Sequence, residues 1–242
     1  MTGIPTDPAA ASTPGGPPDR PATTTPTAQL AVPASADRAG STGQRVVLVR
    51  HGETEWSRTG QHTGRSDIPL DPEGEEQARR LRGRLSGWRF AEVLSSPLRR
   101  AWRTCELAGY AASAHPDPDI QEWYYGAYEG RTAAEIRVER PGWEIWRDGV
   151  VGGESVDDVS RRADRTIERV RSIAGDVALF AHGHFLRILA SRWCGVSALA
   201  GEHLGLSPGA VSVLGYEREA SVIWLWNDTS HLTAPASQVR AP

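Results

Sequence analysis

The sequence predicts a protein of the α/β class, in which helices and strands alternate along the chain and pack in layers. Two short apolar runs, over residues 46–49 and 177–181, have the length and composition of buried strands. Segments with helical periodicity or helix-capping residues separate such runs. Both runs also lead into a His-Gly pair, so polar residues stand where each strand ends.

The first half of the chain is expected to supply two strands and two helices. The strands are expected over 45–50 and 90–94. A helix is expected over about 71–86, because Asp71 is a good N-cap and the Pro and Glu that follow suit a first turn. After the second strand, Ser95 or Ser96 is expected to cap a helix that extends to residue 107.

The second half predicts a long amphipathic helix, a buried strand and a closing hairpin. The helix spans about 155–173, and the strand follows over 176–181. A second helix runs from Gly183 to about residue 194. The closing strands are expected over 210–216 and 222–226. One face of the long helix carries its apolar side chains, Val156, Val159, Ala163, Ile167 and Val170.

The two ends of the chain differ in composition from the rest. Residues 1–43 are Pro, Ala, Thr, Ser and Gly with almost no large apolar side chains, which predicts a disordered tail because little surface can be buried. Residues 233–242 are expected to form a loose C-terminal tail. One folded domain over 44–232 remains.

The charge and cysteine content narrow the class of protein. The formal net charge of −3 suggests neither a nucleic-acid partner nor a membrane partner. No run approaches the roughly 18 apolar residues of a membrane span, and we find no secretory signal pattern. Two cysteines, Cys105 and Cys194, do not make a disulfide framework. We therefore expect a cytoplasmic protein.

The chain contains no lysine, so all 27 basic residues are arginines. A Walker-A phosphate grip, a Schiff base and a lysine general base are thereby excluded. Every fixed cation of a site must come from arginine or protonated histidine.

Several side chains that could take part in catalysis or binding lie at the predicted strand ends. Arg50 and His51 follow the first strand, Arg100 stands at a strand-to-helix junction, and His182 follows the last buried strand. Glu122 belongs to a loop rich in aromatic residues. In open α/β sheets ligands bind outside the carboxyl ends of the strands, so these side chains are expected to share one pocket.

This set of residues suits phosphoryl transfer without a metal or other cofactor. The reaction needs an in-line nucleophile, cations around the phosphoryl oxygens and a proton donor for the leaving group. His51 can form a phosphohistidine, and Glu122 can protonate the leaving oxygen and then deprotonate the attacking water. Arg50, Arg100 and His182 can surround the phosphoryl oxygens.

Two alternatives stay open at this point. Glu129 lies seven residues after Glu122 and could take the same role. His182 and His184 have the spacing of a metal-binding pair on a strand, as in a metallohydrolase, although Arg50 beside a metal ion would be repelled. His184 otherwise serves as a pocket wall or a packing residue.

Five stretches in order, 48–54, 60–70, 95–104, 122–130 and 180–184, resemble the motifs of the histidine phosphatase superfamily, phosphoglycerate-mutase-like branch. The resemblance implies a three-layer α/β/α sandwich with a mostly parallel central sheet. It implies His51 as the phosphorylated nucleophile and Glu122 as the acid/base. It assigns Arg50, Arg100 and His182 to the phosphate pocket.

The resemblance also indicates residues that bind substrate. Many relatives carry Asn where this chain has Ser57, whose shorter hydroxyl puts that phosphate contact in doubt. Thr63 and Gly64 would donate to the phosphate, and the aromatic residues beside Glu122 would shape the leaving-group pocket. The full set is Ser57, Gln61, His62, Thr63, Gly64, Trp123, Tyr124, Tyr125, Gly183 and His184.

Within the superfamily the chain looks most like a group of sugar phosphatases and broad-specificity acid phosphatases, on residues 53–57, 60–64, 146–149, 153–155 and 180–184. We therefore expect a metal-independent phosphomonoesterase for a small phosphorylated metabolite, such as a sugar phosphate or bisphosphate. The alternatives are a phosphoglycerate-type mutase, disfavoured by the absence of a basic insert, a metallohydrolase and an inactive binding module. The expected partner is a small phosphorylated molecule, and a homodimer is left open.

Overall fold

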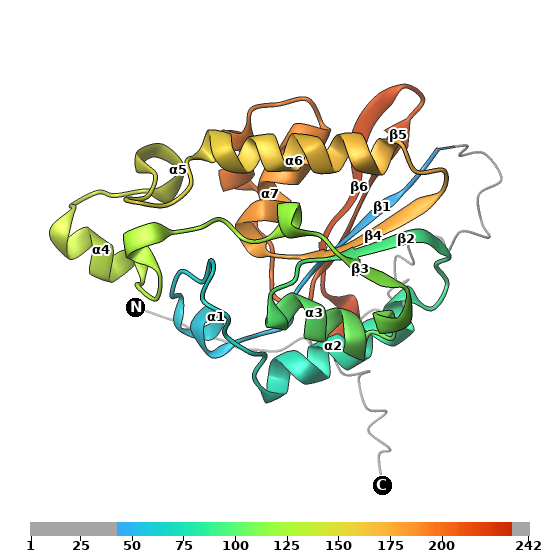
Figure 1. Cartoon of the computed structure of the whole chain (residues 1–242), viewed down its shortest axis with the longest axis horizontal. Coiled ribbons are helices and arrows are strands. Elements are labelled where there is room, and N and C mark those ends of the chain that lie inside the picture. Colours follow the sequence, from blue (N-terminus) through green and yellow to red (C-terminus); the bar gives the residue numbers. More distant parts are fainter. Residues whose placement is uncertain (1–42, 234–242) are drawn as a thin grey trace, which may run out of the picture. The chain divides into compact units, whose positions relative to one another are not determined.

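The computed structural model describes residues 43–233, and a six-stranded sheet lies at their centre (Figure 1). The strands are β1 (Val46–Arg50), β2 (Phe90–Ser95), β3 (Ala114–Pro116), β4 (Asp176–Ala181), β5 (Val211–Glu217) and β6 (Ala220–Asp228). Their order is β3-β2-β4-β1-β5-β6. Neighbours from β3 to β1 are parallel, while β5 is antiparallel to both β1 and β6. The predicted mostly parallel sheet is confirmed.

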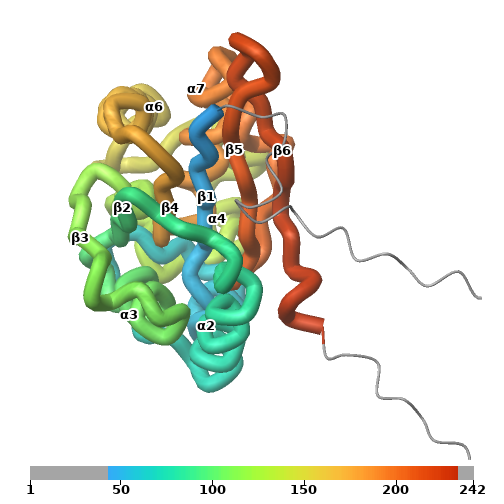
Figure 2. Tube along the Cα trace, turned by 90° about the vertical axis from the view of Figure 1, so that its right-hand side faces the viewer, coloured from blue at the N-terminus to red at the C-terminus, as the bar shows by residue number. Residues whose placement is uncertain are grey.

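Helices cover both faces of the sheet, which confirms the predicted three layers. They are α1 (Glu55–Thr59), α2 (Pro72–Leu85), α3 (Arg99–Leu107), α4 (Ala133–Glu139), α5 (Ile145–Asp148), α6 (Val156–Arg171) and α7 (Gly183–Trp193). Figures 1 and 2 show α6 and α7 over one face and α2 and α3 over the other. No helix among residues 43–233 is long and apolar enough to cross a membrane.

The alternation of side chains along the central strands creates two apolar cores. In β1, Val46 and Leu48 pack into the core with residues of α6 and α7, while Val47 and Val49 pack with α2 and α3 on the other face. Because helices cover both faces, β1 and β4 are apolar at nearly every position. This explains why the two strands were recognisable as continuous apolar runs.

The parallel pairing of β1 with β4 brings two distant motifs together. Arg50 pairs with Ala181 at the carboxyl ends of the strands. The backbone N–H of His51 donates to the Ala181 carbonyl at 3.0 Å. His51 and His182 therefore leave the sheet side by side.

The helix starts predicted at residues 71 and 155 are confirmed. The Asp71 side chain accepts from the N–H of Gly74, and Ser155 forms a capping box with Asp158. The predicted capping of α3 by Ser95 or Ser96 is wrong. That helix begins at Arg99, after an extended Leu98 that makes no side-chain cap.

Of the α-helices and strands named above, four short ones were not predicted, namely α1, β3, α4 and α5. The tails predicted over 1–43 and 233–242 fall outside the described residues, except at residues 43 and 233. These tails and the domain limits 44–232 stay predictions.

Candidate active site

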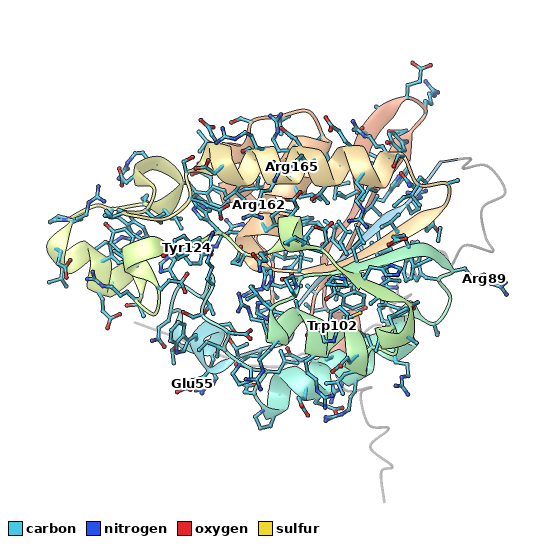
Figure 3. All side chains as sticks on the ribbon, in the orientation of Figure 1. Glu55, Arg89, Trp102, Tyr124, Arg162 and Arg165 are labelled. Atoms are coloured by element: carbon cyan, nitrogen blue, oxygen red, sulfur yellow. The ribbon has the colours of Figure 1, made fainter. Side chains whose placement is uncertain are left out.

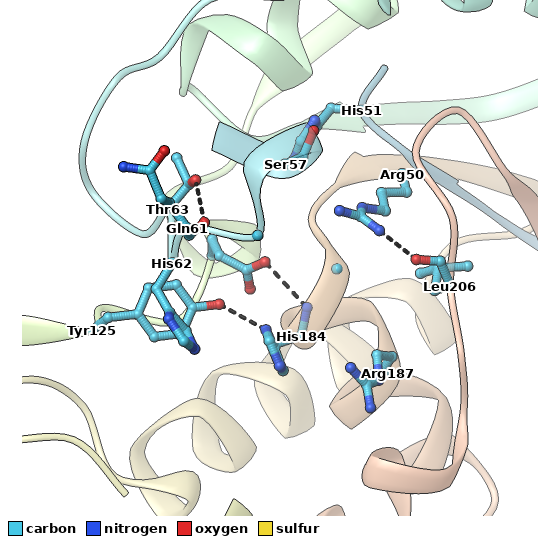
Figure 4. A pocket seen from close by; sticks show the side chains of 13 residues that line it. Arg50, His51, Ser57, Gln61, His62, Thr63, Tyr125, His184, Arg187 and Leu206 are labelled. Carbon is cyan, nitrogen blue, oxygen red and sulfur yellow. Dashed lines mark hydrogen bonds between the residues drawn. The ribbon is translucent and has the colours of Figure 1, made fainter. Parts of the chain in front are cut away.

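A cavity lies beyond the carboxyl ends of β1 and β4, where the first turn of α7 begins (Figure 4). Most of its wall comes from segments that the sequence analysis had singled out. The lining residues are Arg50, His51, Ser57, Gly60, Gln61, His62, Thr63, Glu122, Tyr125, Gly183, His184, Arg187 and Leu206.

His51 presents one defined ring nitrogen for chemistry. Its Nδ1 lies 2.7 Å from the carbonyl oxygen of Gly52. A carbonyl can only accept, so Nδ1 carries the proton and Nε2 keeps its lone pair. Burial holds the pKa of the His51 imidazole well below its usual range, and the positive charges of Arg100 and Arg50 add to this effect. His51 is thus a neutral base or nucleophile.

Arg50 brings a cation to the same end of the cavity. Its Nη1 donates to the carbonyl of Leu206, which fixes the guanidinium. A Cβ atom added to Gly183 would lie 3.4 Å from Arg50 Cζ and Nε and 3.7 Å from Glu122 Oε2. Glycine at 183 therefore leaves room between the cation and the carboxylate.

Arg100 and His182 lie deeper than His51 and do not line the cavity; both are fully buried. The Arg100 guanidinium donates at 2.9 Å to the carbonyls of Thr63, Gly64 and Ser66. The His182 ring centroid lies 5.2 Å from that of His51.

Three buried nitrogens around His51 have no hydrogen-bond partner within the described residues: Arg50 Nε, Arg100 Nε and His182 Nδ1. His182 Nε2 lies 2.8 Å from the Ser96 hydroxyl, which can donate to it and leave the proton on Nδ1. Buried polar groups are seldom left unpaired. Unpaired buried donors in the neighbourhood of His51 favour the binding of an anion there, as expected for a phosphoryl group.

Glu122 is 6% exposed and faces the cavity. Its Oε1 accepts the backbone N–H groups of Trp123 and Phe185, both at 2.9 Å, and its Oε2 accepts that of His184 at 3.1 Å. Two of these donors belong to the first turn of α7, where the helix dipole favours a negative group. Three backbone hydrogen bonds therefore fix the carboxylate at the cavity wall.

Glu129, the other candidate for the acid, does not line the cavity. Its carboxylate accepts the backbone N–H groups of Gly64, Arg65, Ser66 and Tyr125, and the Ser66 hydroxyl. It holds together the loop whose carbonyls bind the Arg100 guanidinium. Of the two acids, the structure places only Glu122 at the cavity.

Seven of the ten residues expected to bind substrate line the cavity: Ser57, Gln61, His62, Thr63, Tyr125, Gly183 and His184. The Ser57 hydroxyl is already engaged in the capping box of α1 with Thr54. Tyr125 and His184 are joined by a hydrogen bond of 2.7 Å between the phenol oxygen and Nδ1 (Figure 4).

The other three expected contacts are not at the cavity. Trp123 is fully buried, and its indole N–H donates to the carbonyl of Glu154. Tyr124, labelled in Figure 3, is not among the lining residues, and Arg65 Cζ lies over its ring, 4.2 Å from the ring centre. The Gly64 N–H is already donated to Glu129. None of the three lines the cavity, and their role in substrate binding stays a prediction.

Three cavity residues were missed, namely Gly60, Arg187 and Leu206. Arg187 follows Gly183 by one helical turn of α7, so the 3.6-residue period could have indicated it. Leu206 comes from an irregular segment without a recognisable pattern.

Residues 43–233 contain no cluster of three or more His, Cys, Asp or Glu side chains suited to a metal ion. The pair with metal-like spacing does not converge, since His182 Nε2 faces Ser96 and His184 Nδ1 faces Tyr125.

Comparison with known proteins gives a consistent picture. The model of the histidine phosphatase superfamily (branch 1) matches residues 46–229. An acid phosphatase of Mycobacterium tuberculosis is 34% identical over 197 residues, covering 79% of this chain and 96% of that protein. A sedoheptulose 1,7-bisphosphatase of Saccharomyces cerevisiae is 37% identical over 187 residues, covering 63% and 68% respectively.

A third relative, named a probable phosphoglycerate mutase in Salmonella paratyphi A, is 31% identical over 207 residues and covers 79% of this chain and 96% of that protein. Among solved structures, an open reading frame product of Mycobacterium tuberculosis superposes with a TM-score of 0.71 at 32% identity. The match covers 76% of this chain and 97% of that one.

Proposed function

Because the chain belongs to branch 1 of the histidine phosphatase superfamily, we propose that it is a metal-independent phosphomonoesterase that works through a phosphohistidine on His51. The observation that carries this proposal is the Nδ1 hydrogen bond of His51 to the Gly52 carbonyl. This bond leaves the Nε2 lone pair free, and burial together with the charges of Arg100 and Arg50 favours the neutral ring.

The first step transfers the phosphoryl group to the enzyme. His51 Nε2 attacks phosphorus, the bond to the leaving oxygen breaks, and Glu122 gives that oxygen its proton. Arg50, Arg100 and His182 each have a buried nitrogen without a partner among the described residues, and these nitrogens hold the phosphoryl oxygens.

The second step releases phosphate. Glu122, now a carboxylate, takes a proton from water while the water oxygen attacks the phosphohistidine. The P–N bond breaks, its electrons return to His51 Nε2, and Glu122 is protonated again. The position of Glu122 at the cavity supports its use in both steps.

The outer part of the cavity supports a polar, hydroxylated leaving group. His62 Nδ1 lies 2.7 Å from the Arg131 carbonyl and so carries the proton, which leaves Nε2 to accept from a substrate hydroxyl. Burial also lowers the pKa of His62, which favours this neutral form. Tyr125 and His184 complete this wall. With the names of the relatives, this favours a sugar phosphate or bisphosphate.

A phosphoglycerate-type mutase is the second candidate, favoured by one relative's name. A mutase must retain a bisphosphorylated intermediate between half-reactions. The sequence lacks the basic insert with which the mutases hold the second phosphate, which supports release rather than retention.

The test is phosphate release from p-nitrophenyl phosphate, sugar mono- and bisphosphates and phosphoglycerates, in chelator. We expect multiple turnovers and, after rapid acid-free quenching, an acid-labile phosphoprotein that His51→Ala abolishes. Labelling that survives in His51→Ala would remove this nucleophile. Conversion of 3- to 2-phosphoglycerate without phosphate release would establish the mutase instead.

A further inference from the structure

The cavity holds more positive charge than a single phosphoryl group requires. Arg50 and Arg187 line it, and Arg100 lies directly behind it. Glu122 is the only acid that lines it. Arg100 also has the carboxylates of Asp67 and Glu129 among its charged neighbours, whereas Glu122 is the carboxylate at the cavity that acts on both Arg50 and Arg187. Of the two cations that line the cavity, one is needed for the reacting phosphoryl group and the other is available to a second anionic group.

Arg187 is that cation, because it stands away from the nucleophile. It follows Gly183, the residue beside Arg50, by four residues or about one turn of α7, a rise of about 6 Å along the helix axis. Figure 4 shows it beside His184, on the wall formed by α7 and below Arg50 and Leu206 in this view.

The neighbours of Arg187 fix its position without neutralising it. Nε donates to the carbonyl of Gly201 at 2.8 Å and Nη2 to that of Glu202 at 2.9 Å. The guanidinium also lies over the Trp146 ring, 4.8 Å from its centre. These hydrogen-bond and stacking partners are neutral, and the carboxylates of Glu122 and Glu202 act on Arg187 by charge without forming an ion pair with it among the described residues. Nη1 remains for a ligand.

We propose that Arg187 binds a second acidic group on the leaving group, so that the preferred substrate is a phosphomonoester whose alcohol carries a phosphate or a carboxylate. This inference rests on the proposed phosphatase function. The shared chemistry is an oxyanion about one helical turn from the reacting phosphorus, and the guanidinium fork suits either kind.

The experiment compares substrate pairs that differ in the acidic group. 3-Phosphoglycerate is paired with glycerol 3-phosphate for a carboxylate, and fructose 1,6-bisphosphate with fructose 1-phosphate for a phosphate. We expect the wild type to prefer the acidic member of at least one pair in kcat/KM. Arg187→Gln should lower that acidic-to-neutral ratio about 10- to 100-fold, the range for a hydrogen bond to a charged group, and Arg187→Lys should restore part of it.

Arg192→Gln is the matched control, because Arg192 lies on the same helix but pairs with Asp164 at 2.9 Å, outside the cavity. An equal loss on both members of each pair in Arg187→Gln, or no loss, would overturn the inference and assign Arg187 to packing on Trp146.

A measurement on the wild type covers the case in which Arg187→Gln does not fold. The two members of each pair are compared as competitive inhibitors of p-nitrophenyl phosphate hydrolysis. We expect the acidic member to bind more tightly by about the same factor, and equal inhibition in both pairs would refute the inference. A wild type that hydrolyses no ester would instead refute the proposed function.

Discussion

Replacing Glu122 by glutamine separates proton transfer from the rest of the proposed chemistry, and its cost can be worked out from the three hydrogen bonds of the carboxylate. A glutamine oxygen can accept the N–H groups of Trp123 and Phe185 as Oε1 does. Its NH2 group then faces the N–H of His184, which loses its acceptor. We expect the free energy of unfolding to fall by about 1–3 kcal/mol, the cost of one unsatisfied buried donor.

The effect on rate should depend on the leaving group. A sugar alcohol needs a proton to depart, whereas p-nitrophenolate departs without one. We expect Glu122→Gln to slow phosphohistidine formation from a sugar phosphate by about 10²- to 10⁴-fold, the usual contribution of a general acid. The loss with p-nitrophenyl phosphate should be much smaller. Rapid-quench kinetics measures this first step alone, so the second role of Glu122 does not obscure it.

Glu129→Gln is the matched comparison, because Glu129 also accepts several backbone N–H groups but stands outside the cavity. It should destabilise the loop at residues 63–66 and slow both substrates alike. A dependence on the leaving group in Glu129→Gln but not in Glu122→Gln would move the acid role to Glu129.

Three further predictions follow from the site and its surroundings. Burial holds the pKa values of three site histidines, His51, His182 and His184, well below 6.5. In acid the unfolded chain therefore binds more protons than the folded chain. The free energy of unfolding should then fall below about pH 6.5, by up to about 1.4 kcal/mol per pH unit for each histidine; urea titrations giving the same value at pH 7 and pH 5 would contradict this. Gly52→Ala would put a Cβ atom 2.2 Å from the Gly74 carbonyl oxygen and should lower the melting temperature, at a cost of about 1–3 kcal/mol or more. Gly83→Ala, in open space on α2, should raise it slightly, and equal effects would refute the packing explanation. A chelator should leave the rate of phosphate release unchanged. If a chelator abolished phosphate release and a divalent metal restored it, the result would favour a metallohydrolase.

The elements that could be predicted are those whose residues decide them locally. Asp71 caps α2 through an N–H three residues away, and β4 is apolar because helices cover both of its sides. The role of Ser96 could not be predicted, because its partner His182 lies 86 residues away on another strand end. The serine that looked like a helix cap instead orients a site histidine.

Short elements escaped prediction because they span too few residues to show a period. The three residues of β3 form a strand because β2 offers its edge. The strand-end location of His51 and Arg50 was predictable from the pattern of a buried strand followed by polar residues. The residues of the outer cavity wall could not be predicted, because a run of three aromatic residues does not reveal that only Tyr125 faces the cavity.

The pairing of β1 with β4 also sets when, during folding, activity can arise. The N–H of Arg45 donates to the Asp176 carboxylate, at the start of these strands, across 131 residues of sequence. Contacts of such long separation carry a large loop-closure entropy and form slowly compared with helices. His51 and His182 become neighbours only after that closure. Recovery of turnover during refolding should therefore lag behind the return of helical signal, and it would report directly on assembly of the central sheet.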